Sequence, residues 1–134
     1  MIKTDIQVRF SDIDMLGHVN NVVLQQYYDL GKTSYLSDVL ALSGLWKDVS
    51  YIVVNTNTNY MGEVFGDRKF HVTTRISRIG SKSITFVQEI VDSVTEVVKS
   101  RSESVLVAFD LKTREGILVS DDHRQKIEAH EGIE

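Results

Sequence analysis

The polar residues between Arg9 and Asn21 have the types and spacing of a reaction site. The stretch reads Arg-Phe-Ser-Asp-Ile-Asp-Met-Leu-Gly-His-Val-Asn-Asn and leads into a predicted helix from about Val22 to about Val39. A helix N-terminus has unpaired backbone N–H groups and partial positive charge, which suit a carbonyl oxygen that becomes negative during a reaction. Asp14 lies six residues before Asn20, close enough for a turn at Gly17 to bring it beside those donors. The stretch therefore predicts a carboxylate next to an oxyanion cradle.

The motif from Asp14 to Asn21, Asp-x-x-Gly-His-Val-Asn-Asn before an aromatic-rich helix, resembles the signature of 4-hydroxybenzoyl-CoA thioesterase-like hotdog proteins. Bacterial long-chain acyl-CoA thioesterases and plant acyl-ACP thioesterases carry related segments. The resemblance extends over nearly the whole chain. It implies a single α+β domain over residues 1–134 with the hotdog fold, in which a long antiparallel sheet wraps around one central helix and a short C-terminal helix follows.

The same resemblance implies a reaction, the hydrolysis of an acyl-CoA or acyl-carrier-protein thioester to free acid and thiol. Asp14 would act as nucleophile or general base, while backbone amides at Gly17, His18 and Val19 and at the helix start would polarise the thioester carbonyl. No metal or cofactor is implied. Many members carry a tyrosine at the position of Leu24. The alternative function is a non-catalytic hotdog module that binds an acyl thioester or serves as an assembly subunit.

Each residue of the motif also has a plain structural interpretation. Asp14 could be only a turn former, because aspartate favours such loops by bonding its own backbone. Asp12 is interpreted as a brace for the loop or a partner of Arg9. His18 is interpreted as a structural imidazole that contributes mainly through its backbone amide. Asn20 and Asn21 are interpreted as helix cap and loop brace, with a substrate or water contact from Asn21 as the lesser alternative.

Other candidate substrate contacts lie outside the motif. Basic side chains flank the turn after Ile79, where coenzyme A phosphates or an acidic carrier protein would find favourable charge. Ordinary solubilising charge on a common hairpin explains them equally well. Aromatic side chains of the helix could line an acyl pocket, although aromatics at helical spacing are more often core. The remaining candidates are Leu24 and Tyr28 on the helix, Asn59 and Glu63 after it, and Arg78, Gly80, Ser81 and Lys82 at the turn.

Composition limits the function further. The 134 residues are 42% hydrophobic, enough for the core of one domain. The chain has no cysteine, which excludes disulfides, thiolate metal sites and a cysteine nucleophile. Its net charge of −4 argues against nucleic-acid binding, and the histidines lack metal-ligand spacing. Without a signal peptide or a run of about 20 apolar residues, we expect a cytoplasmic protein with no membrane insertion.

Hydrophobic periodicity predicts the elements that would position these residues. Residues Ile2 to Phe10 alternate as a half-buried strand. In the helix, Leu24, Tyr28, Gly31 and Tyr35 form one apolar line and Val23, Tyr27, Leu30 and Ser34 form its neighbour. Mid-helix Gly31 indicates a close approach by a sheet or a partner backbone. Trp46, in the loop after the helix, is expected to cap the core or lie at an interface.

The second half of the chain predicts an antiparallel meander. Strands are expected at Ser50 to Met61, Lys69 to Ile79, Ser83 to Val91, Val97 to Phe109 and Ile117 to Val119, and a helix at Asp121 to His130 after Ser120 as N-cap. Asparagines and threonines of both parities between Asn55 and Tyr60 are consistent with either a bulged edge strand or a face toward ligand or subunit. Because long sheets need their edges paired, we expect a homodimer or a dimer of dimers whose pocket is shared.

Overall fold

A computed structural model describes residues 1–42 and 49–133 of the chain. The expectation for Trp46 falls outside the described residues. The elements are, in chain order, β1 Ile2–Ile6, the 3₁₀ turn η1 Phe10–Asp12, α1 Asn21–Leu40, β2 Val49–Tyr60, β3 Phe70–Ile79, β4 Ser83–Asp92, β5 Val98–Asp110, β6 Glu115–Gly116 and α2 Asp121–Glu131. No helix in the described part has the length and apolar character needed to cross a lipid bilayer.

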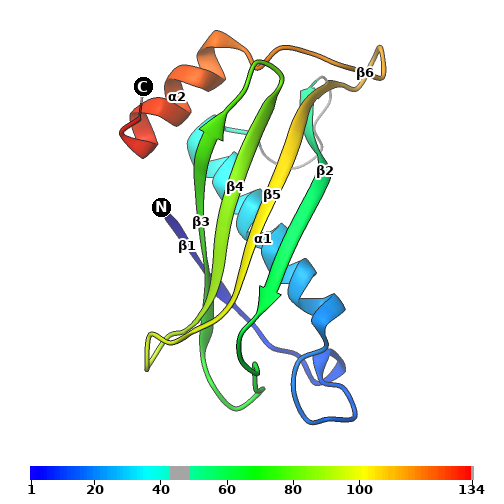
Figure 1. The fold of residues 1–134 in the computed structure, drawn as a ribbon, viewed down its shortest axis with the longest axis vertical. Coiled ribbons are helices and arrows are strands. Elements are labelled where there is room, and N and C mark those ends of the chain that lie inside the picture. Colours follow the sequence, from blue (N-terminus) through cyan, green and yellow to red (C-terminus); the bar gives the residue numbers. More distant parts are fainter. Residues whose placement is uncertain (43–48, 134) are drawn as a thin grey trace.

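The strands form one antiparallel sheet with α1 across one of its faces (Figure 1). The strand order is β1-β3-β4-β5-β2, with the short β6 paired to the end of β5. Strands β3, β4 and β5 are consecutive neighbours, as the predicted meander requires. β2 has only β5 beside it among the described residues, so its other side is a free edge. The predicted hotdog arrangement is confirmed.

The helix α1 begins and ends on clear local signals. The Asn20 side chain accepts a hydrogen bond from the Val22 N–H at 2.8 Å, which caps the first turn. Ala41 adopts a left-handed conformation with φ of 57° and closes the last turn. The helix is thus one residue longer at each end than predicted, and its N-cap, Asn20, is one of the two predicted asparagines. Of the two predicted apolar lines, the one through Tyr28 is fully buried, whereas Leu30 in the other is 45% exposed.

The helix lies close against the sheet at Gly31. A Cβ atom built there would lie 2.6 Å from Thr74 Oγ1, 2.8 Å from Gln88 Nε2 and 2.9 Å from Val72 Cγ1. All three atoms belong to strands β3 and β4 below the helix. The predicted close approach at mid-helix Gly31 is therefore confirmed. Of the two candidates, a sheet or a partner backbone, it is the sheet of the same chain that lies against the glycine.

Two predicted strands differ from the structure. The first ends at Ile6, and Phe10, predicted to lie on the apolar face of that strand, is 98% exposed in the turn η1. The reason is local, because the Asp12 side chain accepts the Arg9 N–H and turns the chain. The predicted strand from Ile117 to Val119 is also absent from the described part of the chain; the pairing with β5 is made instead by Glu115–Gly116.

Two irregularities shape the strands near the predicted sites. The register of β2 against β5 shifts between Val53 and Asn55, so the edge strand is bulged, which was one of the two interpretations of its mixed pattern. The register of β3 against β4 shifts between Ile76 and Arg78. The second bulge immediately precedes the basic hairpin.

Candidate active site

The segment before α1 folds into a compact loop closed by backbone hydrogen bonds. Ile13 and Val19 form an isolated antiparallel bridge, in which the Asp14 N–H donates to the His18 carbonyl at 3.0 Å and the Asn20 N–H to the Asp12 carbonyl at 3.0 Å. At the tip, Gly17 has φ of 85°, a left-handed conformation that favours glycine. The turn expected at this glycine therefore folds Asp14 back toward the start of the helix.

Asp14 is half-buried at the base of this turn. Its Oδ1 accepts the Leu16 N–H at 2.9 Å, so the carboxylate does brace the turn. Its Oδ2 accepts no hydrogen bond from the described part of the chain. One oxygen is thus structural and the other is available for chemistry. Asp14 can therefore form the turn with one oxygen and still offer the other to a substrate, so the two interpretations of this residue are compatible.

The backbone amides near Asp14 differ in availability. The Gly17 N–H donates to the Asp14 carbonyl at 3.1 Å and the Val19 N–H to the Val64 carbonyl at 2.8 Å. Val22 is satisfied by the Asn20 cap. Within the described residues, no acceptor is found for the N–H groups of His18 and Asn21. The N–H of Met15, at the exposed side of the turn, also has no acceptor there. Of these available donors, Asn21 carries the partial positive charge of the helix terminus.

Among the described residues, the imidazole of His18 has a hydrogen-bond contact only with local backbone. Its Nδ1 lies 3.4 Å from the Val19 carbonyl oxygen, and the ring is half-buried. No carboxylate or hydroxyl in that part of the chain pairs with the ring. This placement agrees with the structural interpretation of the side chain and leaves the backbone amide as the chemical group that His18 contributes.

Asp12 is the buried anchor of the loop. The carboxylate is 2% exposed and accepts the Tyr27 hydroxyl at 2.6 Å, the Arg9 N–H at 2.9 Å and the Arg9 guanidinium at 3.1 Å. Burial alone would raise the pKa of Asp12, but the hydrogen bonds from Tyr27 and Arg9 outweigh it and lower the pKa. Burial and the Asp12 carboxylate raise the pKa of Tyr27. The expected brace role of Asp12 is confirmed; Tyr27 is a partner that sequence spacing did not reveal.

A polar cluster joins the first turns of α1 to the free-edge strand β2. Gln25 Nε2 donates to Thr58 Oγ1 at 3.1 Å and to the Tyr60 hydroxyl at 3.3 Å. Thr58 Oγ1 in turn lies 2.9 Å from Ser102 Oγ on β5. Gln25 was not among the residues predicted from the sequence, although the mixed polar pattern of β2 was a signal that the helix-facing side of this strand is polar. The cluster lies on the helix side of the sheet, next to the helix N-terminus.

The other predicted helix and loop contacts are placed as follows. Leu24 and Tyr28 are buried in the core, and the Tyr28 hydroxyl donates to Ser100 Oγ at 2.6 Å. Asn59 is exposed and, by strand alternation with Thr58, points to the opposite face of the sheet from the helix. Glu63 is exposed and adjacent to Val64, whose carbonyl accepts from the motif.

The basic hairpin lies at the opposite end of the sheet from the motif. Figure 1 shows the loop between β1 and α1 at the lower end and the β3–β4 hairpin with α2 at the upper end. The hairpin carries Arg78, Gly80, Ser81 and Lys82. One copy of the chain therefore brings together Asp14, the motif amides and the loop of Glu63, but not the predicted phosphate contacts.

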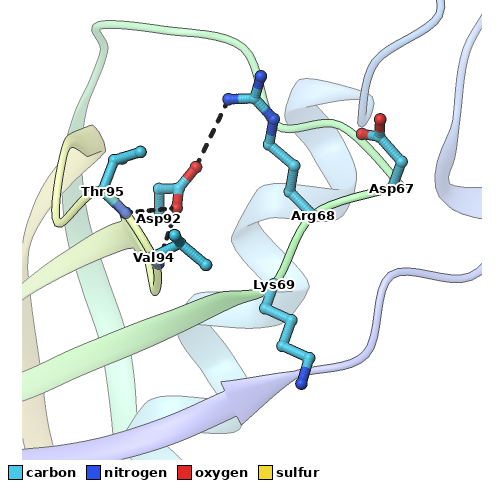
Figure 2. Close-up of a pocket in the computed structure, with 6 residues that line it drawn as sticks. All are labelled: Asp67, Arg68, Lys69, Asp92, Val94 and Thr95. Carbon is cyan, nitrogen blue, oxygen red and sulfur yellow. Dashed lines mark hydrogen bonds and ion pairs between the residues drawn. The ribbon is translucent and has the colours of Figure 1, made fainter.

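Two surface cavities lie elsewhere. One of about 450 Å³ is lined by Asp67, Arg68, Lys69, Asp92, Val94 and Thr95 (Figure 2). Its Asp92 carboxylate accepts the Val94 and Thr95 N–H groups and lies 3.7 Å from the Arg68 guanidinium. A second, of about 230 Å³, is lined by Ile6, Gln7, Arg9, Gln26, Tyr27 and Leu30. Asp14 does not line either of these two.

A helix packed across an antiparallel sheet of this strand order defines the class of hotdog-fold proteins. The chain belongs to the thioesterase-like superfamily, whose family model matches residues 8–127. It is 23% identical to the long-chain acyl-CoA thioesterase FadM of Escherichia coli K12 over 95% of this chain and 97% of that protein.

Two further similarities are consistent with this family. The chain is 30% identical to the uncharacterized protein YsmA of Bacillus subtilis 168 over 80 residues, which are 60% of this chain and 54% of that protein. A thioesterase of Thermus thermophilus solved with coenzyme A and Zn superposes with a TM-score of 0.84 at 24% identity, over 98% of this chain and 95% of that one.

Proposed function

We propose that the protein hydrolyses an acyl-CoA or acyl-carrier-protein thioester to a free acid and a thiol. The observation that carries the proposal is the position of Asp14. Its Oδ2 accepts no hydrogen bond from the described residues, and Asp14 lies in the loop that contains the available amide of His18 and leads to that of Asn21 at the start of α1. Membership of the thioesterase-like superfamily and the similarity to FadM support thioester hydrolysis. The similarity to a structure containing coenzyme A supports that thiol in particular.

The proposed chemistry divides between the donors and the carboxylate. The N–H groups of His18 and Asn21 would hold the thioester oxygen as it becomes negative, and the helix terminus would stabilise the charge. Asp14 would either attack the carbonyl carbon or take a proton from the attacking water. Collapse of the intermediate breaks the carbon–sulfur bond and expels the thiolate. If Asp14 is the nucleophile, this step leaves a mixed anhydride that water then hydrolyses; if Asp14 is the base, it gives the free acid directly. In both routes the thiolate leaves as the thiol by taking up the proton that the water gives up. A donor of this kind is worth about 3 to 4 kcal/mol in the transition state, so the amides rival the carboxylate.

A second copy of the chain would complete the site. The motif and the basic hairpin lie at opposite ends of the sheet, and the long edge of β2 is free in the described residues. If two β2 edges pair antiparallel about a two-fold axis, the Tyr60 end of one strand lies opposite the Val49 end of the other. The hairpin of one subunit then approaches the motif of its partner. Exposed Ile52, Val53 and Val54 on this edge support such a contact.

Thiol release tests the proposal against the non-catalytic alternative. Wild-type protein would be assayed with short, medium, long and aromatic acyl-CoAs and with an acyl-carrier protein, beside Asp14→Asn and the control Asp38→Asn at an exposed position of α1. We expect turnover by the wild type and the control, and a loss of about 10² to 10⁴-fold in Asp14→Asn. If folded wild-type protein binds acyl-CoA but turns over no substrate, the hydrolase proposal fails and the non-catalytic binding module is the function that remains.

A further inference from the structure

The C-terminal segment holds the basic β3–β4 hairpin at its turn. The Arg124 guanidinium donates from Nη2 to the Gly80 carbonyl at 2.8 Å, and the Val119 N–H donates to the Ser81 carbonyl at 2.9 Å. The Ala108 N–H of β5 donates to the Lys82 carbonyl at 2.8 Å. Three successive carbonyls of the turn are thus fixed by donors that lie outside it, two of them in the C-terminal segment.

This arrangement determines where the amides of the turn point. In a trans peptide the carbonyl and the following N–H point in opposite directions. Because the Gly80 and Ser81 carbonyls face the protein, the N–H groups of Ser81 and Lys82 face away from it. Neither has an acceptor among the described residues, and both residues are exposed. Consecutive outward amides form a concave site for an anion, here beside the side chains of Arg78 and Lys82.

A second contact fixes the base of the hairpin. The Glu131 carboxylate, with its side chain 7% exposed, accepts the Ile76 N–H at 2.8 Å at the bulge of β3. The same oxygen accepts the Tyr35 hydroxyl at 3.1 Å. Ile127, between the two contacts, is completely buried in the core. The helix α2 is therefore bonded to the hairpin at its turn, through Arg124, and at its base, through Glu131. A shift of α2 would move the turn with it.

We propose that Arg124 is a positioning residue for an anion site on the β3–β4 hairpin. By holding the Gly80 carbonyl it orients the Ser81 amide toward the phosphates of the coenzyme A part of the substrate, without touching the substrate itself. This inference rests on the proposed function for its ligand. It predicts that Arg124 affects affinity for the nucleotide-bearing thiol and leaves the chemical step at Asp14 unchanged.

Binding and kinetics together test this role. Coenzyme A binding would be measured by calorimetry for the wild type, Arg124→Met, Arg124→Lys and the control Lys126→Met, which removes the same charge from α2 at a residue paired with Asp122. We expect Arg124→Met to weaken binding about tenfold, Arg124→Lys to restore part of it and the control to match the wild type. In turnover, KM for an acyl-CoA should rise about tenfold with kcat within about twofold. KM for the same acyl group on N-acetylcysteamine, which has no phosphate, should not change.

The outcomes separate this inference from the proposed function. Unchanged coenzyme A affinity in Arg124→Met, or no binding by the wild type, overturns the positioning role. An equal rise in KM for both thioesters also overturns it, because a general loss of structure would do the same. If the wild type binds coenzyme A but hydrolyses neither thioester, the hydrolase proposal fails, while weaker binding by folded Arg124→Met still supports the anion site.

Discussion

The Tyr27 hydroxyl lies 2.6 Å from Oδ2 of Asp12 and joins the second turn of α1 to the loop that carries the candidate carboxylate. Asp12 is two residues before Asp14, and its backbone carbonyl accepts the Asn20 N–H. The same residue therefore fixes the loop to the helix side chain and to the helix cap. Rigid support of this kind is what a preorganised site requires.

Loss of the Tyr27 hydroxyl should destabilise the fold more than loss of a neighbouring hydroxyl. Tyr27→Phe removes a donor from a buried carboxylate, so we expect the free energy of unfolding to fall by about 1.5 to 3 kcal/mol. Tyr28→Phe, which removes a bond to the neutral Ser100, is the control and should cost about 1 kcal/mol. Urea unfolding of the two variants measures both values. Equal losses would contradict a special role for the Asp12 contact.

Acid should weaken the fold through Asp12. Its pKa is lowered in the folded state, so its stabilising contribution is complete above the unfolded pKa of about 3.9 and disappears as pH falls through the lower folded value. We expect the free energy of unfolding to decrease between about pH 5 and the folded pKa, less steeply in Asp12→Asn. Urea unfolding at a series of pH values measures the slope. Equal slopes in the two proteins would show that Asp12 is not responsible.

Alanine at Gly31 should destabilise the protein, against the usual trend. Alanine normally gains about 1 kcal/mol over glycine inside a helix. Here the new Cβ would crowd Thr74, Gln88 and Val72, and overpacking of that kind costs about 1 to 3 kcal/mol. Thermal unfolding should give a lower midpoint for Gly31→Ala. The exposed Thr33→Ala is the control for helix propensity, and an increase in stability at both positions would refute the close-approach argument.

Charge on the free edge of β2 should separate the subunits. A double variant, Ile52→Lys with Val54→Lys, places two lysines on the exposed edge and disfavours strand pairing. We expect light scattering to give half the wild-type mass and thiol release to fall with it, because the motif and hairpin would no longer meet. Val94→Lys with Leu118→Lys, at exposed apolar residues away from β2, is the control. An unchanged mass in the edge variant would exclude this interface.

Much of the fold was predictable because its signals are local. The Asn20 cap, the close approach at Gly31 and the hairpin between Ile79 and Ser83 each follow from residue types within a few positions. Phe10 was placed wrongly because alternation continued through it, while the Asp12 side chain ended the strand. Here a side-chain contact overrode a periodic pattern.

The site was predictable only in part, for a different reason. The bond between Tyr27 and Asp12 spans fifteen residues, and that between Gln25 and Thr58 spans thirty-three. Such pairs depend on how the helix lies on the sheet, which no local pattern encodes. Likewise, the sequence predicted the amides of Gly17 and Val19 as donors to the substrate. Only the folded loop reveals that both already donate to backbone carbonyls.

Because α1 touches the sheet at Gly31, a tilt of the helix about this contact would move its N-terminus. Asn21, whose amide is a proposed donor to the thioester oxygen, lies ten residues away, or about 15 Å along the helix axis. A tilt of about 4° at Gly31 would displace that amide by about 1 Å, a misplacement that can cost about 10²-fold in rate. A change in the size of Thr74, Gln88 or Val72, which face Gly31, would therefore be felt at a donor three turns away.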